Sequence, residues 1–160
     1  MKPIVLGTDG SPTSEKATKL AVELARETAS RLCVVAAWHT PLTNYSYEQI
    51  RSIPEIDQHE QKRAHDAAQA ALDLAEAEGV EVESFVRNGD PVDMITQTAG
   101  NCDASFIVVG SHGWGAIRRL VFGSVSTALL HHAPCPVLVA RLDEGPTSNH
   151  AETEHIAHST

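Results

Sequence analysis

The chain has 160 residues, a length that suits one compact domain, and its 42 % hydrophobic and 21 % charged residues are typical of a globular protein with a sizeable core. Twelve basic and 21 acidic residues give a formal net charge of −9, which disfavours binding to nucleic acid or to an anionic membrane. No apolar run approaches the ~20 residues that span a bilayer, and the three cysteines form no CxxC pair, so we expect a cytoplasmic protein with reduced thiols.

The first third of the sequence predicts two buried strands with a helix between them. Residues 2–9 form an apolar run that ends in polar residues, typical of a strand that leaves its sheet at Asp9. From 14 to 31, small and apolar residues recur at steps of three and four, which predicts an amphipathic helix. Residues 32–38 are again continuously apolar and predict a second strand. Residues 40–54 lack periodicity, and a loop of that length is a candidate lid.

The middle third predicts a long helix, an edge strand and a capped helix. Residues 55–78 are alanine-rich, and a glycine follows as a stop signal for the helix. Residues 80–86 alternate between two faces, which predicts a half-exposed strand at the edge of a sheet. Asp90 followed by Pro91 is typical of a helix start, and we expect this helix to end before Gly100.

The last third predicts a strand over 105–110, a helix over 124–133 and a final strand over 137–141. Residues 143–160 hold four acidic residues and no Lys or Arg, with few apolar side chains to bury. Such a segment gains little from ordering, so we expect a disordered acidic tail after a folded domain at 1–142. The histidines of this tail match no zinc-binding spacing.

The regular alternation of strands and helices predicts a three-layer, doubly wound α/β domain around a five-stranded parallel sheet. In such a sheet, ligands bind beyond the carboxyl ends of the strands, where the strand order reverses. The residues that follow the first, second and fourth predicted strands are therefore the first candidates for a site.

Two glycine sites lie at the ends of one long connection after the fourth predicted strand. Gly110 and Gly113 leave the strand, and the missing Cβ atoms let backbone N–H groups converge on an anion. Gly123 precedes Ser124, a predicted N-cap, so the next helix would direct free N–H groups and its positive dipole end into the same cleft. Together with Asp9 at a neighbouring strand end, the pattern favours a polyphosphate site over turns and a cap alone.

Several common enzyme motifs are missing from the sequence. It contains neither G-x-x-x-x-G-K-[ST] nor a G-x-G-x-x-G after the first strand, which excludes ordinary P-loop NTPases and Rossmann dehydrogenases. It has no G-x-S-x-G elbow for a serine hydrolase, and no strand-end lysine that would make Asp9 a receiver-type phosphoacceptor. No catalytic or metal-ligating residue is predicted.

The stretches VVGSHG (108–113), GSVS (123–126) and HAPCPVLVAR (132–141) strongly resemble the ATP-binding class of the universal stress protein family, and the likeness covers residues 2–141. The resemblance implies strand order 3-2-1-4-5 and an ATP molecule whose triphosphate carries any Mg²⁺. The ATP-binding residues that it implies are Gly7, Asp9, Ala37, Val109, Gly110, Gly113, Gly123, Ser124, Val125 and Ser126.

One position departs from the family pattern. Trp114 follows the GSHG stretch at a place that is usually basic in the family, so a phosphate contact is lost there. Arg118 and Arg119, further along the same connection, are the candidates to replace it.

The resemblance favours an ATP-dependent regulatory or interaction module of the stress response, since no general base stands beside a phosphate. A slow ATPase or autokinase, and a nucleotide-free dimeric scaffold, are the alternatives. The last strand would present an apolar, unpaired edge, and the resemblance implies that a second copy covers it. We therefore expect a homodimer centred on Val137, Leu138 and Val139.

Overall fold

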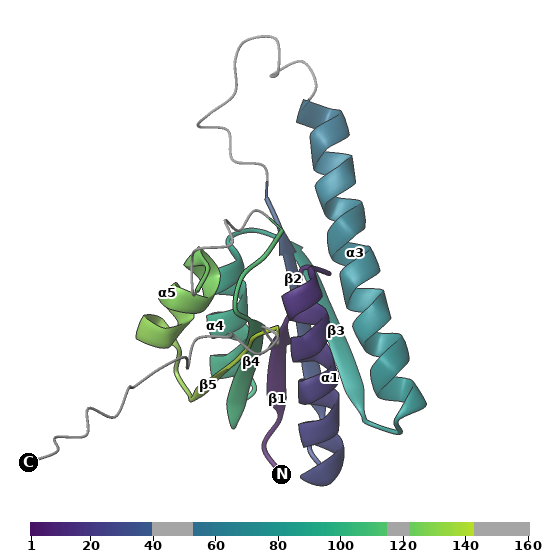
Figure 1. Ribbon diagram of the computed structural model, residues 1–160, viewed down its shortest axis with the longest axis vertical. Helices are drawn as coiled ribbons and strands as arrows, with labels where there is room; N and C mark the ends of the chain where they lie inside the picture. Colours follow the sequence, from purple (N-terminus) through teal and green to yellow (C-terminus); the bar gives the residue numbers. More distant parts are fainter. Residues whose placement is uncertain (40–52, 115–121, 143–160) are drawn as a thin grey trace, which may run out of the picture.

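The computed structural model describes residues 1–39, 53–114 and 122–142, which form one sheet with helices on both faces (Figure 1). The elements in chain order are β1 (Ile4–Gly7), α1 (Pro12–Glu27), β2 (Leu32–Trp38), α3 (Ile53–Ala77), β3 (Val82–Asn88), α4 (Pro91–Asn101), β4 (Phe106–Gly110), α5 (Ser124–His132) and β5 (Val137–Ala140). All strand pairs are parallel, in the order β3-β2-β1-β4-β5. The predicted fold class and strand order are confirmed.

Two apolar clusters fill the space on the two faces of the sheet. Helices α1 and α3 cover one face, and α4 and α5 cover the other (Figure 1). Successive residues of β1 alternate between them: Ile4 and Leu6 pack on the α1 side, and Val5 packs on the α4 side. This alternation explains why the central strands read as continuous apolar runs, because both of their faces are buried.

Strand β3 lies at one edge of the sheet and β5 at the other. The β3 side chains alternate as predicted, with Val82 and Val86 on the α3 side and Phe85 on the α4 side. No helix of the described residues has the length and apolarity needed to cross a membrane.

The predicted start of α4 is confirmed, and its predicted end is wrong. The Asp90 carboxylate caps the helix by accepting hydrogen bonds from the backbone N–H groups of Val92 (2.8 Å) and Asp93 (3.1 Å). Gly100 lies inside the helix, which continues to Asn101. The chain turns at Asp103, which has a positive φ of 51° and lies three residues after the glycine that suggested the stop.

The ends of α1 and the start of α3 also differ from prediction. Helix α1 begins at Pro12, since proline is favoured in a first helical turn. It ends at Glu27 instead of residue 31 because Ala29 adopts a left-handed conformation, with φ of 48°. Helix α3 begins at Ile53 and so takes in the last two residues of the predicted loop. The rest of the candidate lid, the tail over 143–160, and Arg118 with Arg119 fall outside the described residues.

Candidate functional site

The carboxyl end of β1 forms a tight turn that fixes Asp9. The Thr8 N–H still donates to the Val35 carbonyl of β2 (3.0 Å), and then Gly10 turns the chain with a positive φ of 74°. One carboxylate oxygen of Asp9, Oδ1, accepts a hydrogen bond from the Ser11 N–H at 2.9 Å. Its other oxygen, Oδ2, takes no part in that bond and faces the loop that follows β4, beside position 113.

The first turn of α1 holds the loop that follows β4. The hydroxyls of Ser11 (3.4 Å) and Thr13 both donate to the carbonyl oxygen of His112. A Cβ at position 110 would lie 2.6 Å from Oγ1 of Thr13 and 2.7 Å from the backbone nitrogen of Ser14. Gly110 is therefore required for the close approach of α1, whatever it contributes to a ligand.

The two predicted glycine sites come together in the structure. The Gly123 N–H donates to the Ser111 carbonyl at 2.6 Å, and the Ser126 hydroxyl donates to the same oxygen at 2.9 Å. A Cβ at position 123 would lie 3.1 Å from Cα of His112. These hydrogen bonds hold the start of α5 against the loop after β4, and one of them comes from the buried Ser126 hydroxyl.

The N-cap of α5 is Gly123 and not Ser124, which corrects the sequence prediction. Gly123 has extended backbone angles, and Ser124 is the first helical residue, with an exposed side chain. The Thr127 N–H bonds to the Gly123 carbonyl, so the preceding N–H groups of the first turn have no partner within the helix. The expected helix N-terminus beside the loop after β4 is therefore present, with its cap one residue earlier than predicted.

The loop after β4 and the N-terminus of α5 together form a cradle of backbone groups, which we call the cradle below. Asp9 and Gly113 lie at its mouth. A Cβ at position 113 would lie 2.5 Å from Oδ2 of Asp9, so only glycine fits there without moving the carboxylate. The carboxyl end of β1 and the loop after β4 therefore form one continuous surface of carboxylate and backbone groups.

The side-chain positions of the remaining predicted residues lie mainly against the core. A Cβ at Gly7 would lie 2.6 Å from Cδ1 of Ile95, and the Val109 side chain belongs to the α4-side core. Val125 packs against the same core. Ala37 is half-buried at the end of β2, and continuing the Gly7–Val35 pairing places it level with Asp9.

Trp114 joins this surface in a way that sequence reasoning missed. Its indole Nε1–H donates to the Asp9 carbonyl at 2.8 Å, while 59 % of the residue is exposed. The guanidinium of Arg63, from α3, lies 5.4 Å from the centre of the indole ring. No sequence signal points to Arg63, because its place depends on how α3 packs across the end of β1.

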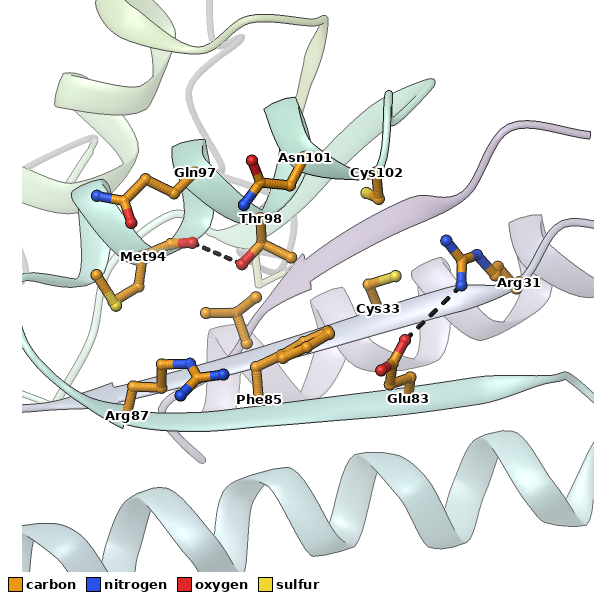
Figure 2. A pocket seen from close by; sticks show the side chains of 11 residues that line it. Arg31, Cys33, Glu83, Phe85, Arg87, Met94, Gln97, Thr98, Asn101 and Cys102 are labelled. Carbon is orange, nitrogen blue, oxygen red and sulfur yellow. Dashed lines mark hydrogen bonds and ion pairs between the residues drawn. The ribbon is translucent and has the colours of Figure 1, made fainter.

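A separate groove of about 290 Å³ lies between α4 and the strands β2 and β3 (Figure 2). Arg31 pairs with Glu83 across two strands at 3.7 Å, and Cys33 lies on the groove floor facing α4. Burial, with Cys102 nearby, raises the pKa of Cys33 to about 11, so this thiol stays protonated at neutral pH. None of the predicted site residues lines the groove, and the described residues hold no cluster of three or more metal-ligating side chains.

Comparison with known sequences assigns a family to this architecture. Residues 1–141 match the sequence model of the universal stress protein family. A universal stress protein of Bacillus subtilis, YxiE, is 31 % identical over 144 residues, covering 86 % of this chain and 97 % of the relative. A Mycobacterium tuberculosis universal stress protein is 34 % identical, and there the chain spans 45 % of the relative.

Solved structures share the fold. UspA from Lactobacillus plantarum superposes with a TM-score of 0.75 at 22 % identity, over 88 % of this chain and 97 % of that protein. Two structures at 26 % identity were determined with nucleotides. One is a universal stress protein in complex with cAMP (TM-score 0.64, covering 87 % and 96 %), and the other is the Archaeoglobus fulgidus protein in complex with dAMP (0.62, covering 88 % and 98 %).

Proposed function

Because the chain belongs to the universal stress protein family, we propose that it binds an adenine nucleotide, ATP foremost, between the ends of β1 and β4. Binding would make it a nucleotide-dependent regulatory or interaction module of the stress response. The observation that carries this proposal is the meeting of Gly113, Gly123 and Asp9 at one cradle. The nucleotides in the two related structures support the choice of adenine.

Each side of the cradle suits a different part of the ligand. The phosphates would bind the backbone N–H groups of the loop after β4 and of the first turn of α5, with the exposed Ser124 hydroxyl beside them. The adenosine would lie against Asp9 and Ala37, where a carboxylate oxygen can accept from a ribose hydroxyl or an amino group. Any Mg²⁺ would be held by phosphate oxygens and water, since the cradle offers one carboxylate.

We propose binding without rapid hydrolysis. Among the described residues, His112 adjoins the cradle, and its Nδ1 already bonds the Ser111 hydroxyl at 2.9 Å. The Asp9 carboxylate is assigned to the adenosine side of the site, with Oδ1 held by the turn that follows β1. A general base must reach the attacking water, and neither group is placed as one beside the phosphate cradle.

The nature of the resident ligand is tested by mass spectrometry of nucleotide released from the purified, denatured protein. ATP is the expected product, and AMP or a cyclic nucleotide would redefine the ligand. Single-turnover phosphate release then separates the binding module from a slow ATPase, because the module should release phosphate no faster than ATP does in buffer.

Asp9 tests the adenosine side of the site. Asp9→Ala should weaken ATP and adenosine together by about 10- to 100-fold, because a hydrogen bond to a charged acceptor is worth about 1.5–3 kcal/mol. Asp9→Asn is the matched control for the turn, since its side-chain oxygen can still accept from the Ser11 N–H. Unchanged calorimetric affinities in folded Asp9→Ala would place the nucleotide elsewhere.

We also propose a homodimer through the free edge of β5. Among the described residues, β5 pairs only with β4, and Leu138 is 36 % exposed between the half-buried Val137 and Val139. An apolar strand with an unpaired edge invites pairing with a second strand, and a symmetric copy satisfies both edges at once.

A further inference from the structure

A positively charged side chain lies at the mouth of the cradle, although the connection after β4 places an indole there. Arg63 belongs to α3, 51 positions before Trp114 in the sequence. Its guanidinium lies 5.4 Å from the centre of the Trp114 ring, within the range of a cation–π contact. The same indole donates from Nε1 to the Asp9 carbonyl, which ties Arg63 through one ring to the end of β1.

The packing of α3 fixes this position. A Cβ at Gly10 would lie 3.4 Å from Cβ of Ala67, so α3 rests directly on the turn after β1. Arg63 lies one helical turn before Ala67 and therefore on the same face of the helix. Its side chain is 35 % exposed, so it is partly shielded from water.

Arg63 has one further partner among the described residues, and that partner can be exchanged. Its Nη1 donates to both carboxylate oxygens of Glu60, at 2.9 and 3.2 Å. A partly exposed pair of this kind on one helix contributes little to stability. A polyphosphate carries more charge and offers several oxygens to the planar guanidinium, so it can compete with Glu60.

We propose that Arg63 is a phosphate-binding residue of the nucleotide site and that Trp114 is the platform that holds its guanidinium beside Gly113. This inference rests on the proposed function and adds a residue from α3 to a site otherwise built on α5 and the ends of β1, β2 and β4. Arg63 favours ligands in proportion to their phosphate charge, so it selects ATP over AMP and adenosine.

The test compares ATP, AMP and adenosine affinities by calorimetry in Arg63→Met and Lys62→Met. Lys62 is the matched control: it is the adjacent residue of α3, carries the same charge, and pairs with Asp66 on the exposed surface at 2.5 Å. Arg63→Met should weaken ATP about tenfold, AMP less, and adenosine by less than twofold. Lys62→Met should leave all three within twofold, and Arg63→Lys should recover part of the ATP affinity.

Two further variants separate direct contact from general electrostatics. Trp114→Leu should lose the same selectivity for ATP, and the double variant with Arg63→Met should lose little more, because both changes remove one interaction. Glu60→Gln should strengthen ATP binding, since it frees the guanidinium.

The outcomes distinguish this inference from the proposed function. Wild-type protein that binds no adenine nucleotide would overturn both. Wild-type protein that binds ATP, while Arg63→Met shows the same ATP-to-adenosine ratio as Lys62→Met, would overturn the role of Arg63 alone.

Discussion

Two glycines of the same loop, Gly110 and Gly113, have different neighbours and should respond differently to substitution. A Cβ at Gly110 would meet the backbone of α1, with the Ser14 nitrogen at 2.7 Å. The helix backbone cannot move aside without losing its packing on the sheet. Among the described residues, a Cβ at Gly113 would meet only the Asp9 carboxylate, at an exposed position.

We expect Gly110→Val to lower the free energy of unfolding by several kcal/mol, as overpacking in a core does. Gly113→Val should keep its stability and lose ATP affinity, because its side chain both displaces Asp9 and blocks the approach of phosphate. Urea denaturation and calorimetry measure the two effects. Equal stabilities would contradict the packing role of Gly110.

The sequence predicted where the loop after β4 and the start of α5 lie better than it predicted the neighbours of each glycine. The spacing from Gly110 to Ser124 located the loop and the helix that the structure joins. The spacing could not distinguish the glycines that are needed for packing from the one that borders the cradle. Gly7 leaves room for a core side chain and Gly110 for helix α1, whereas Gly113 faces the Asp9 carboxylate. That distinction depends on atoms from distant parts of the chain.

Helices α1, α3 and α4 are each followed by a residue in the left-handed conformation, and the sequence predicted this ending correctly only for α3. After α3, Gly79 adopts φ of 70° and the Val80 N–H donates to the Ala75 carbonyl at 2.9 Å. After α1 and α4 the same left-handed position is held by Ala29 and Asp103. A glycine at this position is a recognisable stop signal, whereas an alanine or an aspartate is not. The sequence therefore predicts the ends of α1 and α4 at the wrong residues.

Ala29 and Gly79 form a matched pair for testing this ending. Ala29→Gly should raise the free energy of unfolding by about 0.5–1 kcal/mol, because glycine enters the left-handed region without a Cβ clash. Gly79→Ala should lower it by about 1 kcal/mol, because a Cβ there meets no atom of the described residues within 4 Å and the cost comes from the backbone conformation. Chemical denaturation measures both, and shifts of the same sign would contradict the explanation.

The packing of α4 against β2 gives the protein a pH-dependent stability. Burial raises the pKa of Cys33 from 9.0 to about 11, so the folded state keeps this proton after the unfolded chain has lost it. Ionisation of this thiol therefore leaves stability unchanged below pH 9 and lowers it as pH rises towards 11. Urea denaturation between these limits should show a steeper loss of stability for the wild type than for Cys33→Ala. Parallel profiles would show that Cys33 does not contribute.

The fold class followed from local pattern, because each central strand is buried on both faces and each helix has one apolar stripe. Strand order came from the family resemblance. The register of α3 against the end of β1 came from neither, although it places Arg63 over Trp114. Such contacts between distant segments depend on the fit of whole layers, which no local signal encodes.

The free edge of β5 connects the fold to assembly, and backbone geometry singles out the residues concerned. Ile107 donates to the Pro136 carbonyl and Ser111 to the Ala140 carbonyl, so alternate residues of this strand face β4. The peptide groups of Val137 and Val139 therefore face away from β4. Those outward N–H and C=O groups are the ones that a second copy would pair with.

Val139→Pro removes one outward donor and leaves the hydrogen bonds to β4 in place, so the variant should fold and lose the dimer. Val139→Thr is the matched control, since it keeps the N–H and a β-branched side chain. Light scattering at micromolar concentration should give a dimer for the wild type and Val139→Thr, and a monomer for Val139→Pro with an unchanged dichroism spectrum. A monomeric wild type would overturn the dimer itself, and a dimeric Val139→Pro would move the interface away from β5.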